Sequence, residues 1–85
     1  MLQFYVEHPI TAIASHPIHK IIVACTNDGR INFYSIKELK NYGNMILSKE
    51  EYVTCINFSK DGTALILATN TGKVSIIESL NWEKF

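Results

Sequence analysis

Three histidines and one cysteine are the side chains of this 85-residue chain with the most obvious capacity to hold a metal ion: His8, His16, His19 and Cys25. Imidazole and thiolate groups are the usual ligands of zinc. However, His16 and His19 are expected in a turn at the opposite end of a strand from His8. No CxxC or HxxxH pair supplies further ligands. The sequence therefore predicts no metal site and no cofactor.

Two other patterns could be mistaken for catalytic or phosphate-binding motifs. Ser15 and His16 are adjacent in sequence, but they do not form an oriented triad, and no Gly-x-Ser-x-Gly elbow is present. The Asp61-Gly62 and Asn27-Asp28-Gly29 segments lack the further glycines and the lysine of a phosphate-binding loop. We expect turns here and no enzyme. A small enzyme is the disfavoured alternative, because it would need convergent titratable groups in a cleft.

Charge and hydropathy favour a cytoplasmic protein with a packed core. Eight basic and eight acidic side chains cancel, so nucleic acid and membrane surfaces are not expected as partners. The apolar run Ile21–Cys25 is too short to span a bilayer, and no signal peptide opens the chain. Cys25 and Cys55 lie in apolar segments without close spacing, which predicts reduced, buried side chains.

The elements that would position these residues follow an internal repeat of 43 residues. Shifting the chain by this period without a gap divides it into residues 1–43 and residues 44–85, so the chain is predicted to be two copies of one unit. The identical pairs are Glu7 with Glu50, Thr11 with Thr54, Ile13 with Ile56, Thr26 with Thr69, Asn27 with Asn70, and Gly29 with Gly72.

Each unit is predicted to consist of short strands joined by tight turns. Apolar and β-branched clusters alternate with Gly, Asp, Asn and Pro, which is the pattern of β-hairpins. The expected strands are Ile10–Ser15, Ile21–Thr26, Arg30–Ile36, Val53–Ser59, Ala64–Thr69 and Lys73–Glu78.

The middle strand of each unit is apolar throughout, as in Ile21–Cys25 and Ala64–Ala68. Both faces of such a strand must be covered. Because the hairpin turns require antiparallel pairing, the sequence predicts antiparallel sheets stacked face against face.

These features resemble the WD-repeat family of β-propellers. Val53–Gly62 resembles the first inner strand and turn of that family, and Asp28-Gly29 and Thr71-Gly72 lie where it has its Asp-Gly turn. The signature Trp-Asp pair is replaced by Tyr34-Ser35 and by Ile77-Glu78. The Gly-His pair is missing, since His8 is too close to Ile10 and Glu51 takes the matching place. The family's buried polar network is thus expected to be incomplete, with Thr26 and Asp28 supplying part of it.

The resemblance implies an all-β fold of antiparallel four-stranded blades, with two WD-type repeats forming part of a β-propeller. Each copy would begin with an outer strand, at Leu2–Val6 and Met45–Ser48, followed by three inner strands. One blade would then be complete. The open edges would be closed by the rest of a longer propeller or by further copies of the chain in a ring.

The resemblance also implies a non-catalytic protein–protein interaction scaffold within a larger assembly. The loosely conserved repeats of this chain also resemble those of large ciliary and cytoskeletal scaffold proteins. Phe33 and Phe58 are expected between blades, whereas Tyr52 and Trp82 fall where an exposed aromatic side chain could anchor a partner. The implied partner-binding rim consists of His8, Pro9, Asn27, Asp28, Glu50, Glu51, Tyr52, Asn70 and Thr71.

Overall fold

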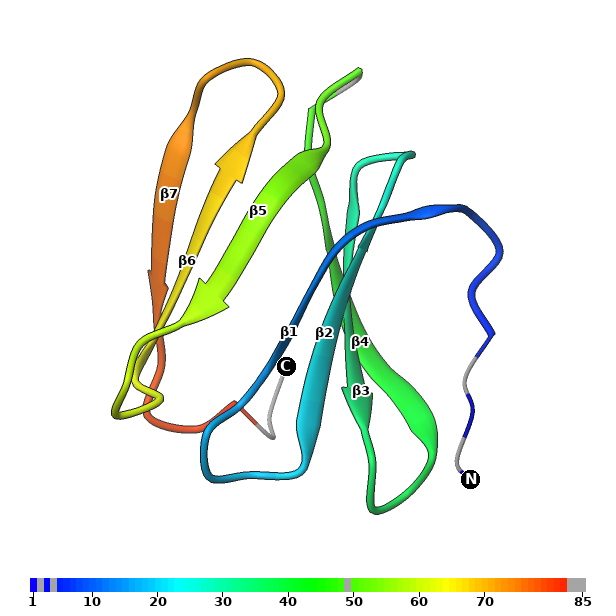
Figure 1. Ribbon diagram of the computed structural model, residues 1–85, viewed down its shortest axis with the longest axis vertical. Helices are drawn as coiled ribbons and strands as arrows, with labels where there is room; N and C mark the ends of the chain where they lie inside the picture. Colours follow the sequence, from blue (N-terminus) through cyan, green and yellow to red (C-terminus); the bar gives the residue numbers. More distant parts are fainter. Residues whose placement is uncertain (2, 4, 49, 83–85) are drawn as a thin grey trace.

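The computed structural model describes residues 1, 3, 5–48 and 50–82, which form seven strands in two antiparallel sheets (Figure 1). The first sheet has the order β1-β2-β3-β4 and the second has the order β5-β6-β7. This confirms the expected all-β fold of antiparallel blades. The strands are β1 (Ile10–Ser15), β2 (Ile21–Thr26), β3 (Arg30–Ser35), β4 (Lys40–Ile46), β5 (Val53–Phe58), β6 (Ala64–Thr69) and β7 (Val74–Glu78).

The six inner strands lie within one residue of their predicted ends, and glycine-containing turns fix where three of the hairpins reverse. Gly29, Gly62 and Gly72 have φ angles of 88°, 78° and 88°. A side chain with a Cβ rarely adopts this left-handed conformation. The Asp-Gly and Thr-Gly signals therefore marked the true turns.

The outer strands differ from the prediction. Strand β4 begins at Lys40, five residues before the expected Met45, and pairs with β3 along its length. The amide nitrogen of Glu38 donates a hydrogen bond to Ser35 Oγ at 3.1 Å, which tightens the preceding turn. The connection between β3 and β4 is therefore only a short turn. In the expected strand Leu2–Val6, Leu2 and Phe4 lie outside the described residues, and the other three are not in a strand.

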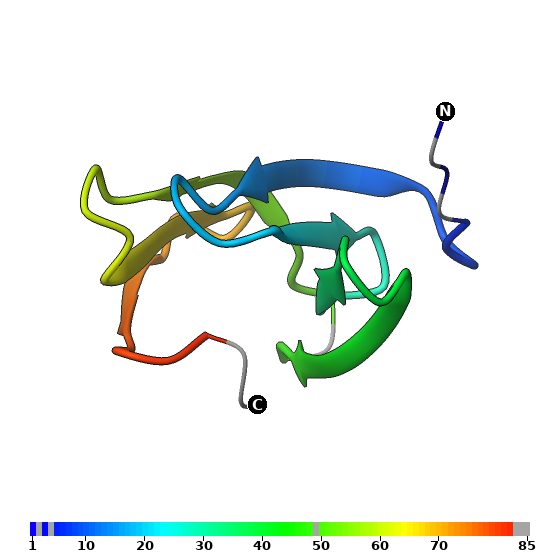
Figure 2. The ribbon, with the colours of Figure 1, turned by 90° about the horizontal axis from the view of Figure 1, so that it is seen from below.

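The core lies between the two sheets, which contact each other most closely along β1 and β5 (Figure 2). From the first sheet, the core includes Ile21, Val23, Cys25, Ile31 and Phe33. From the second sheet, it includes Val53, Ile56, Leu65 and Leu67. Face-to-face stacking is thus what buries the apolar strands, as the sequence indicated.

The two middle strands are not equally covered. Four of the five residues of the Ile21–Cys25 run are buried, which confirms that both faces of β2 are covered. In β6, by contrast, Ile66 is 41% exposed. Cys55 is also exposed, so the expectation that both cysteines are buried is wrong for this residue. One face of the second sheet is therefore open.

Trp82 belongs to the core, and the alternative that it is an exposed anchor is wrong. Its side chain is only 2% exposed because the chain after β7 turns back beneath the two sheets (Figure 1). The indole is near-parallel to Phe33, at 6.3 Å between ring centroids, and meets Phe58 edge-on at 5.3 Å. Phe33 and Phe58 thus lie between the sheets as predicted, and Trp82 closes the gap below them.

Candidate interaction rim

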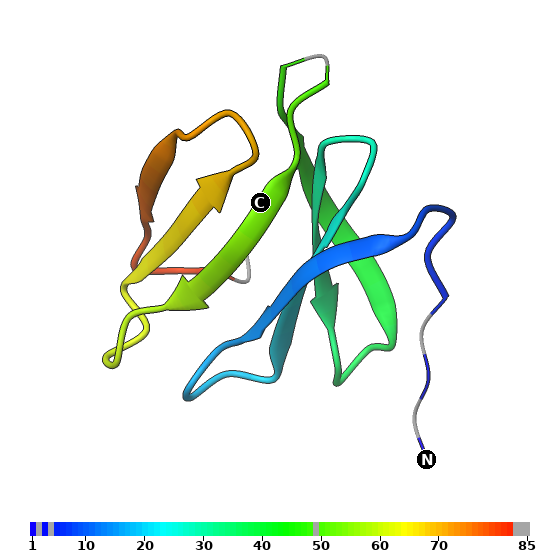
Figure 3. The same cartoon turned by 45° about the horizontal axis from the view of Figure 1, so that its top comes forward.

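The loops before β1 and β5 and the β2–β3 and β6–β7 turns lie at one end of the sheets (Figure 3). They carry the nine predicted rim residues, as two loop–turn pairs. In the first pair, the amide nitrogen of Asn27 in the β2–β3 turn donates a hydrogen bond to the carbonyl oxygen of Pro9 at 3.0 Å. In the second pair, the amide nitrogen of Asn70 donates to the carbonyl oxygen of Tyr52 over the same distance. The same bond in both copies shows that the 43-residue repeat extends to the backbone of the rim.

In the first copy, a polar network is centred on Asp28. Thr26 Oγ1 donates a hydrogen bond to the Asp28 carboxylate, and Arg30 Nε lies 2.9 Å from its Oδ2. His8 Nε2 lies 3.5 Å from the same oxygen, so His8 reaches the network despite its closeness to Ile10 in the sequence. The hydrogen bond from Thr26, more than the neighbouring charges, lowers the pKa of Asp28.

In the second copy, the network is centred on Glu51, whose side chain is only 5% exposed. Its Oε2 accepts hydrogen bonds from Thr71 Oγ1 at 2.7 Å and from Thr69 Oγ1 at 3.2 Å. Lys73 Nζ lies 3.4 Å from Oε1. The hydrogen bond from Thr71 is the main cause that lowers the pKa of the Glu51 carboxyl. Glu51 is therefore a buried residue that holds the β6–β7 turn in place and does not itself offer a contact surface.

The two networks are related by an exchange of residue types. The shift of 43 residues aligns His8 with Glu51 and Asp28 with Thr71. The carboxylate thus moves from the turn in the first copy to the preceding loop in the second. The threonine and the cation keep their places, since Arg30 aligns with Lys73. The family's network is incomplete as expected, since neither copy has its tryptophan, and Thr26 and Asp28 supply part of it. Each copy nevertheless has one carboxylate held by a threonine and a basic residue. The exchange of residue types is visible when the two copies are aligned, so it could have been predicted from the sequence.

Asn70 fixes the shape of the second half of the rim. Its Oδ1 accepts a hydrogen bond from the amide nitrogen of Tyr52 at 2.8 Å, and its Nδ2 donates to the carbonyl oxygen of Glu50 at 3.1 Å. Tyr52 is half-buried and is therefore not a freely projecting anchor. The exposed part of the rim is mainly polar and consists of His8, Pro9, Asn27, Asp28, Glu50, Asn70 and Thr71.

The histidines at the other end of the sheets have a structural arrangement. His16 is buried, and its Nδ1 accepts hydrogen bonds from the amide nitrogens of Ile18 and His19 at 3.0 and 2.9 Å. Its Nε2 then donates to the carbonyl oxygen of Gly62 at 3.0 Å. Among the described residues, no group of three or more His, Cys, Asp or Glu side chains could hold a metal ion. Likewise, the part of the chain that is described contains no helix able to cross a membrane.

Antiparallel sheets stacked face to face, with loop–turn networks at one end, agree with the arrangement of neighbouring blades in a β-propeller. Residues 1–35 match the family described as WD domain, G-beta repeat, so the chain carries a WD repeat. Repeats of this family are generally non-catalytic and build scaffold propellers that mediate protein interactions.

The chain is also similar to "Cilia- and flagella-associated protein 337 B" of Tetrahymena thermophila. The two are 33% identical over 69 residues, which cover 80% of this chain and 6% of that protein. The chain thus spans a small part of the length of the relative it matches.

Proposed function

We propose that this chain is a non-catalytic part of a longer WD-repeat propeller that acts as a protein-interaction scaffold in a larger assembly. The observation that carries the proposal is the open face of the second sheet. On this face, Ile66, Val74 and Ile76 are 41%, 69% and 63% exposed. Such a row of exposed β-branched side chains on a regular sheet is typical of an interaction surface.

The internal repeat supports a further sheet as the occupant of this face. The shift of 43 residues aligns Ile66 with Val23, Val74 with Ile31, and Ile76 with Phe33. These three partners are at most 1% exposed, because the second sheet covers them. The open face therefore has the same pattern as the face of the first sheet that is already buried against a neighbouring blade.

A homo-oligomeric ring, in which the first sheet of another copy covers this face, is less well supported. A second copy would present Ala24, Asn32 and Tyr34 at the positions that align with Leu67, Ser75 and Ile77. Asn32 and Tyr34 are only 6% and 7% exposed, and they line a cavity together with Tyr5 and Val6 of the N-terminal segment. This face is more polar and partly covered already. A repeat with an apolar face fits better.

Mass in solution separates the two arrangements. Light scattering of the 85-residue chain at several concentrations is expected to show a monomer or heterogeneous association, and no discrete ring. Since each chain brings two repeats, a single stable species with an even number of blades would support the homo-oligomeric ring and contradict the longer propeller.

The rim is proposed to bind protein partners of that assembly. The support is its rigid, exposed polar surface, which loops on a stacked scaffold are well suited to provide. A cytoplasmic location, with a ciliary or cytoskeletal assembly, is part of the proposal, because a cilia- and flagella-associated protein is among the similar sequences.

Affinity purification of the intact protein tests the rim. Asn27→Arg places a bulky cation on its exposed surface, and Asn44→Arg makes the same change on the exposed surface of β4, as a matched control. We expect one stable set of partners with the unsubstituted protein and with Asn44→Arg, and its loss with Asn27→Arg. Retention of all partners by Asn27→Arg would contradict rim binding, and catalytic turnover by the isolated chain would overturn the scaffold function.

A further inference from the structure

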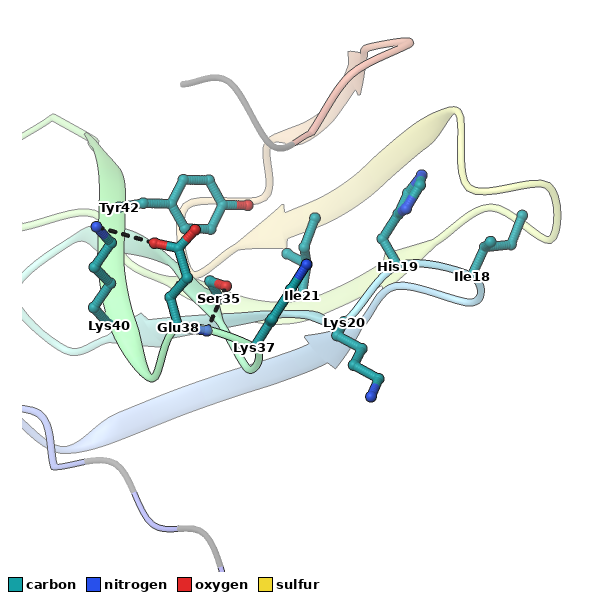
Figure 4. A pocket seen from close by; sticks show the side chains of 9 residues that line it. All are labelled: Ile18, His19, Lys20, Ile21, Ser35, Lys37, Glu38, Lys40 and Tyr42. Atoms are coloured by element: carbon teal, nitrogen blue, oxygen red, sulfur yellow. Dashed lines mark hydrogen bonds and ion pairs between the residues drawn. The ribbon is translucent and has the colours of Figure 1, made fainter.

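A cavity of about 570 Å³ opens at the end of the sheets opposite the rim (Figure 4). It lies between the β1–β2 turn and the β3–β4 turn of the first sheet. The side chains that line it are Ile18, His19, Lys20, Ile21, Ser35, Lys37, Glu38, Lys40 and Tyr42.

The lining of this cavity carries an excess of positive charge, although the net charge of the whole chain is zero. Its lining holds three of the eight basic residues and one of the eight acidic residues. Glu38 pairs with Lys40, at 3.0 Å between Oε2 and Nζ. Lys20 and Lys37 form no ion pair with any other described residue. The excess of positive charge in the lining therefore comes from Lys20 in the β1–β2 turn and Lys37 in the β3–β4 turn.

The walls of the cavity are fixed before any ligand arrives. His16 Nδ1 accepts the two amide hydrogen bonds that shape the β1–β2 turn, and Ser35 Oγ accepts one from the β3–β4 turn. Tyr42 donates a hydrogen bond from its hydroxyl to the carbonyl oxygen of Trp82 at 2.7 Å. A pre-formed site loses less conformational entropy on binding than a mobile one does.

An apolar surface accompanies the charges. Ile18 is 72% exposed at the edge of the cavity, whereas Ile21 forms its buried floor at 3% exposure. A ligand that is only anionic would leave Ile18 in water. A peptide that combines carboxylates with one aliphatic side chain would cover Ile18 and meet the lysines together.

The internal repeat shows that the fold does not require these charges. The shift of 43 residues aligns Lys20 with Thr63, Lys37 with Leu80 and Glu38 with Asn81. The residues that shape the turns behave differently, since Gly29 matches Gly72 and Thr26 matches Thr69. The second copy thus builds the corresponding three inner strands without these charges.

We propose that this pocket binds an extended peptide segment of a partner protein that is rich in aspartate or glutamate and contains an aliphatic side chain. The proposal deepens the scaffold function and rests on it for the class of partner, whereas the site is separate from the rim. Nucleic acid is disfavoured because its bases would need an exposed aromatic ring to stack on, and the ring of Tyr42, already held by its hydroxyl, is half-buried.

The test is fluorescence anisotropy of the folded 85-residue chain with a labelled glutamate-rich peptide that contains one isoleucine. Lys37→Glu reverses one charge of the pocket. Lys60→Glu makes the same change at an exposed lysine of the β5–β6 turn, outside the pocket, and serves as the matched control. Circular dichroism establishes that both variants are folded.

We expect Lys37→Glu to weaken peptide binding by about fivefold or more, with a much smaller effect of Lys60→Glu. Raising the salt concentration should weaken binding to the unsubstituted chain, because the lysines are exposed. Equal effects of the two variants, or no binding of the peptide, would contradict the proposal that the pocket binds an acidic peptide. A single-stranded oligonucleotide bound as tightly, with the same dependence on Lys37, would identify a general polyanion site and overturn the peptide proposal. None of these outcomes alters the purification result with Asn27→Arg, so failure of the pocket is distinguishable from failure of the scaffold.

Discussion

Trp82 donates a hydrogen bond from its indole Nε1 to the carbonyl oxygen of Gly62 over 2.6 Å, across 20 residues of chain. The same carbonyl oxygen lies 3.0 Å from Nε2 of His16, which comes from the other sheet. One backbone acceptor therefore joins three parts of the molecule: the β1–β2 turn, the β5–β6 turn and the segment after β7. We expect the stability of the two sheets to depend on this point.

Replacement of Trp82 by alanine is expected to destabilise the chain by about 3–5 kcal/mol, because it empties a closely packed aromatic site. The midpoint of urea denaturation measures the effect. Tyr5→Ala is the control, since Tyr5 is also aromatic but is 88% exposed. Similar midpoints for the two variants would show that Trp82 does not hold the sheets together.

Two glycines with similar backbone angles allow steric contact to be separated from backbone strain. A Cβ on Gly62 would lie 2.5 Å from the ring of His16, whereas a Cβ on Gly72 would meet nothing within 4 Å. Gly72→Ala should therefore cost only the left-handed backbone strain, about 1–2 kcal/mol. Gly62→Ala should cost clearly more in the same denaturation experiment. Equal costs would mean that the His16 contact is easily relieved.

The lowered pKa of Glu51 predicts a loss of stability in acid. The folded state holds the carboxylate more strongly than the unfolded state does, so this contribution is present above the usual pKa of 4.5. It is lost as the pH falls through the lower folded-state pKa. Denaturation of Glu51→Gln at a series of pH values should show a smaller decrease in acid.

Glu50→Gln provides the control for Glu51, because it removes the same charge from the exposed rim without affecting the bonds of Thr69 and Thr71. This variant should keep the acid-induced decrease that Glu51→Gln reduces. If the two variants have the same pH dependence, the buried network makes no specific contribution.

The two cysteines should differ in reactivity. Cys55 is exposed, whereas Cys25 is buried and burial raises its pKa to about 12. Since the thiolate is the reactive form, iodoacetamide at mildly alkaline pH should modify Cys55 and spare Cys25. Mass spectrometry of digested protein locates the modification, and both residues should react in strong denaturant. Rapid modification of Cys25 without denaturant would contradict the described core.

The sequence predicted local structure well where a single residue type determines the backbone. Gly29, Gly62 and Gly72 identified their turns because the left-handed conformation strongly favours glycine. The apolar run of β2 predicted stacked sheets for a similarly direct reason. In both cases the physical cause lies within a few neighbouring residues.

Features that depend on the path of the chain in space were harder to predict. The burial of Trp82 follows from a return beneath the sheets that no local pattern marks. The exposure of Cys55 depends on which face of the second sheet is covered, and the early start of β4 depends on its pairing with β3, in which Lys40 lies opposite Ser35. The role of Glu51 is hard to predict for a different reason: its carboxylate takes the place of His8 in the other copy, so the residue type at this position is not kept between the two copies.

The exchanged positions of Asp28 and Glu51 constrain how two such units can diverge. His8→Glu alone would place two carboxylates together in the first unit, where like charges repel. Asp28→Thr alone would leave Arg30 without its ion pair and His8 without its carboxylate neighbour. Either single substitution is unfavourable, while the pair restores the arrangement of the second unit. The two repeats therefore differ by two substitutions that compensate each other, and we expect a loop moved into the other repeat to need its own turn as well.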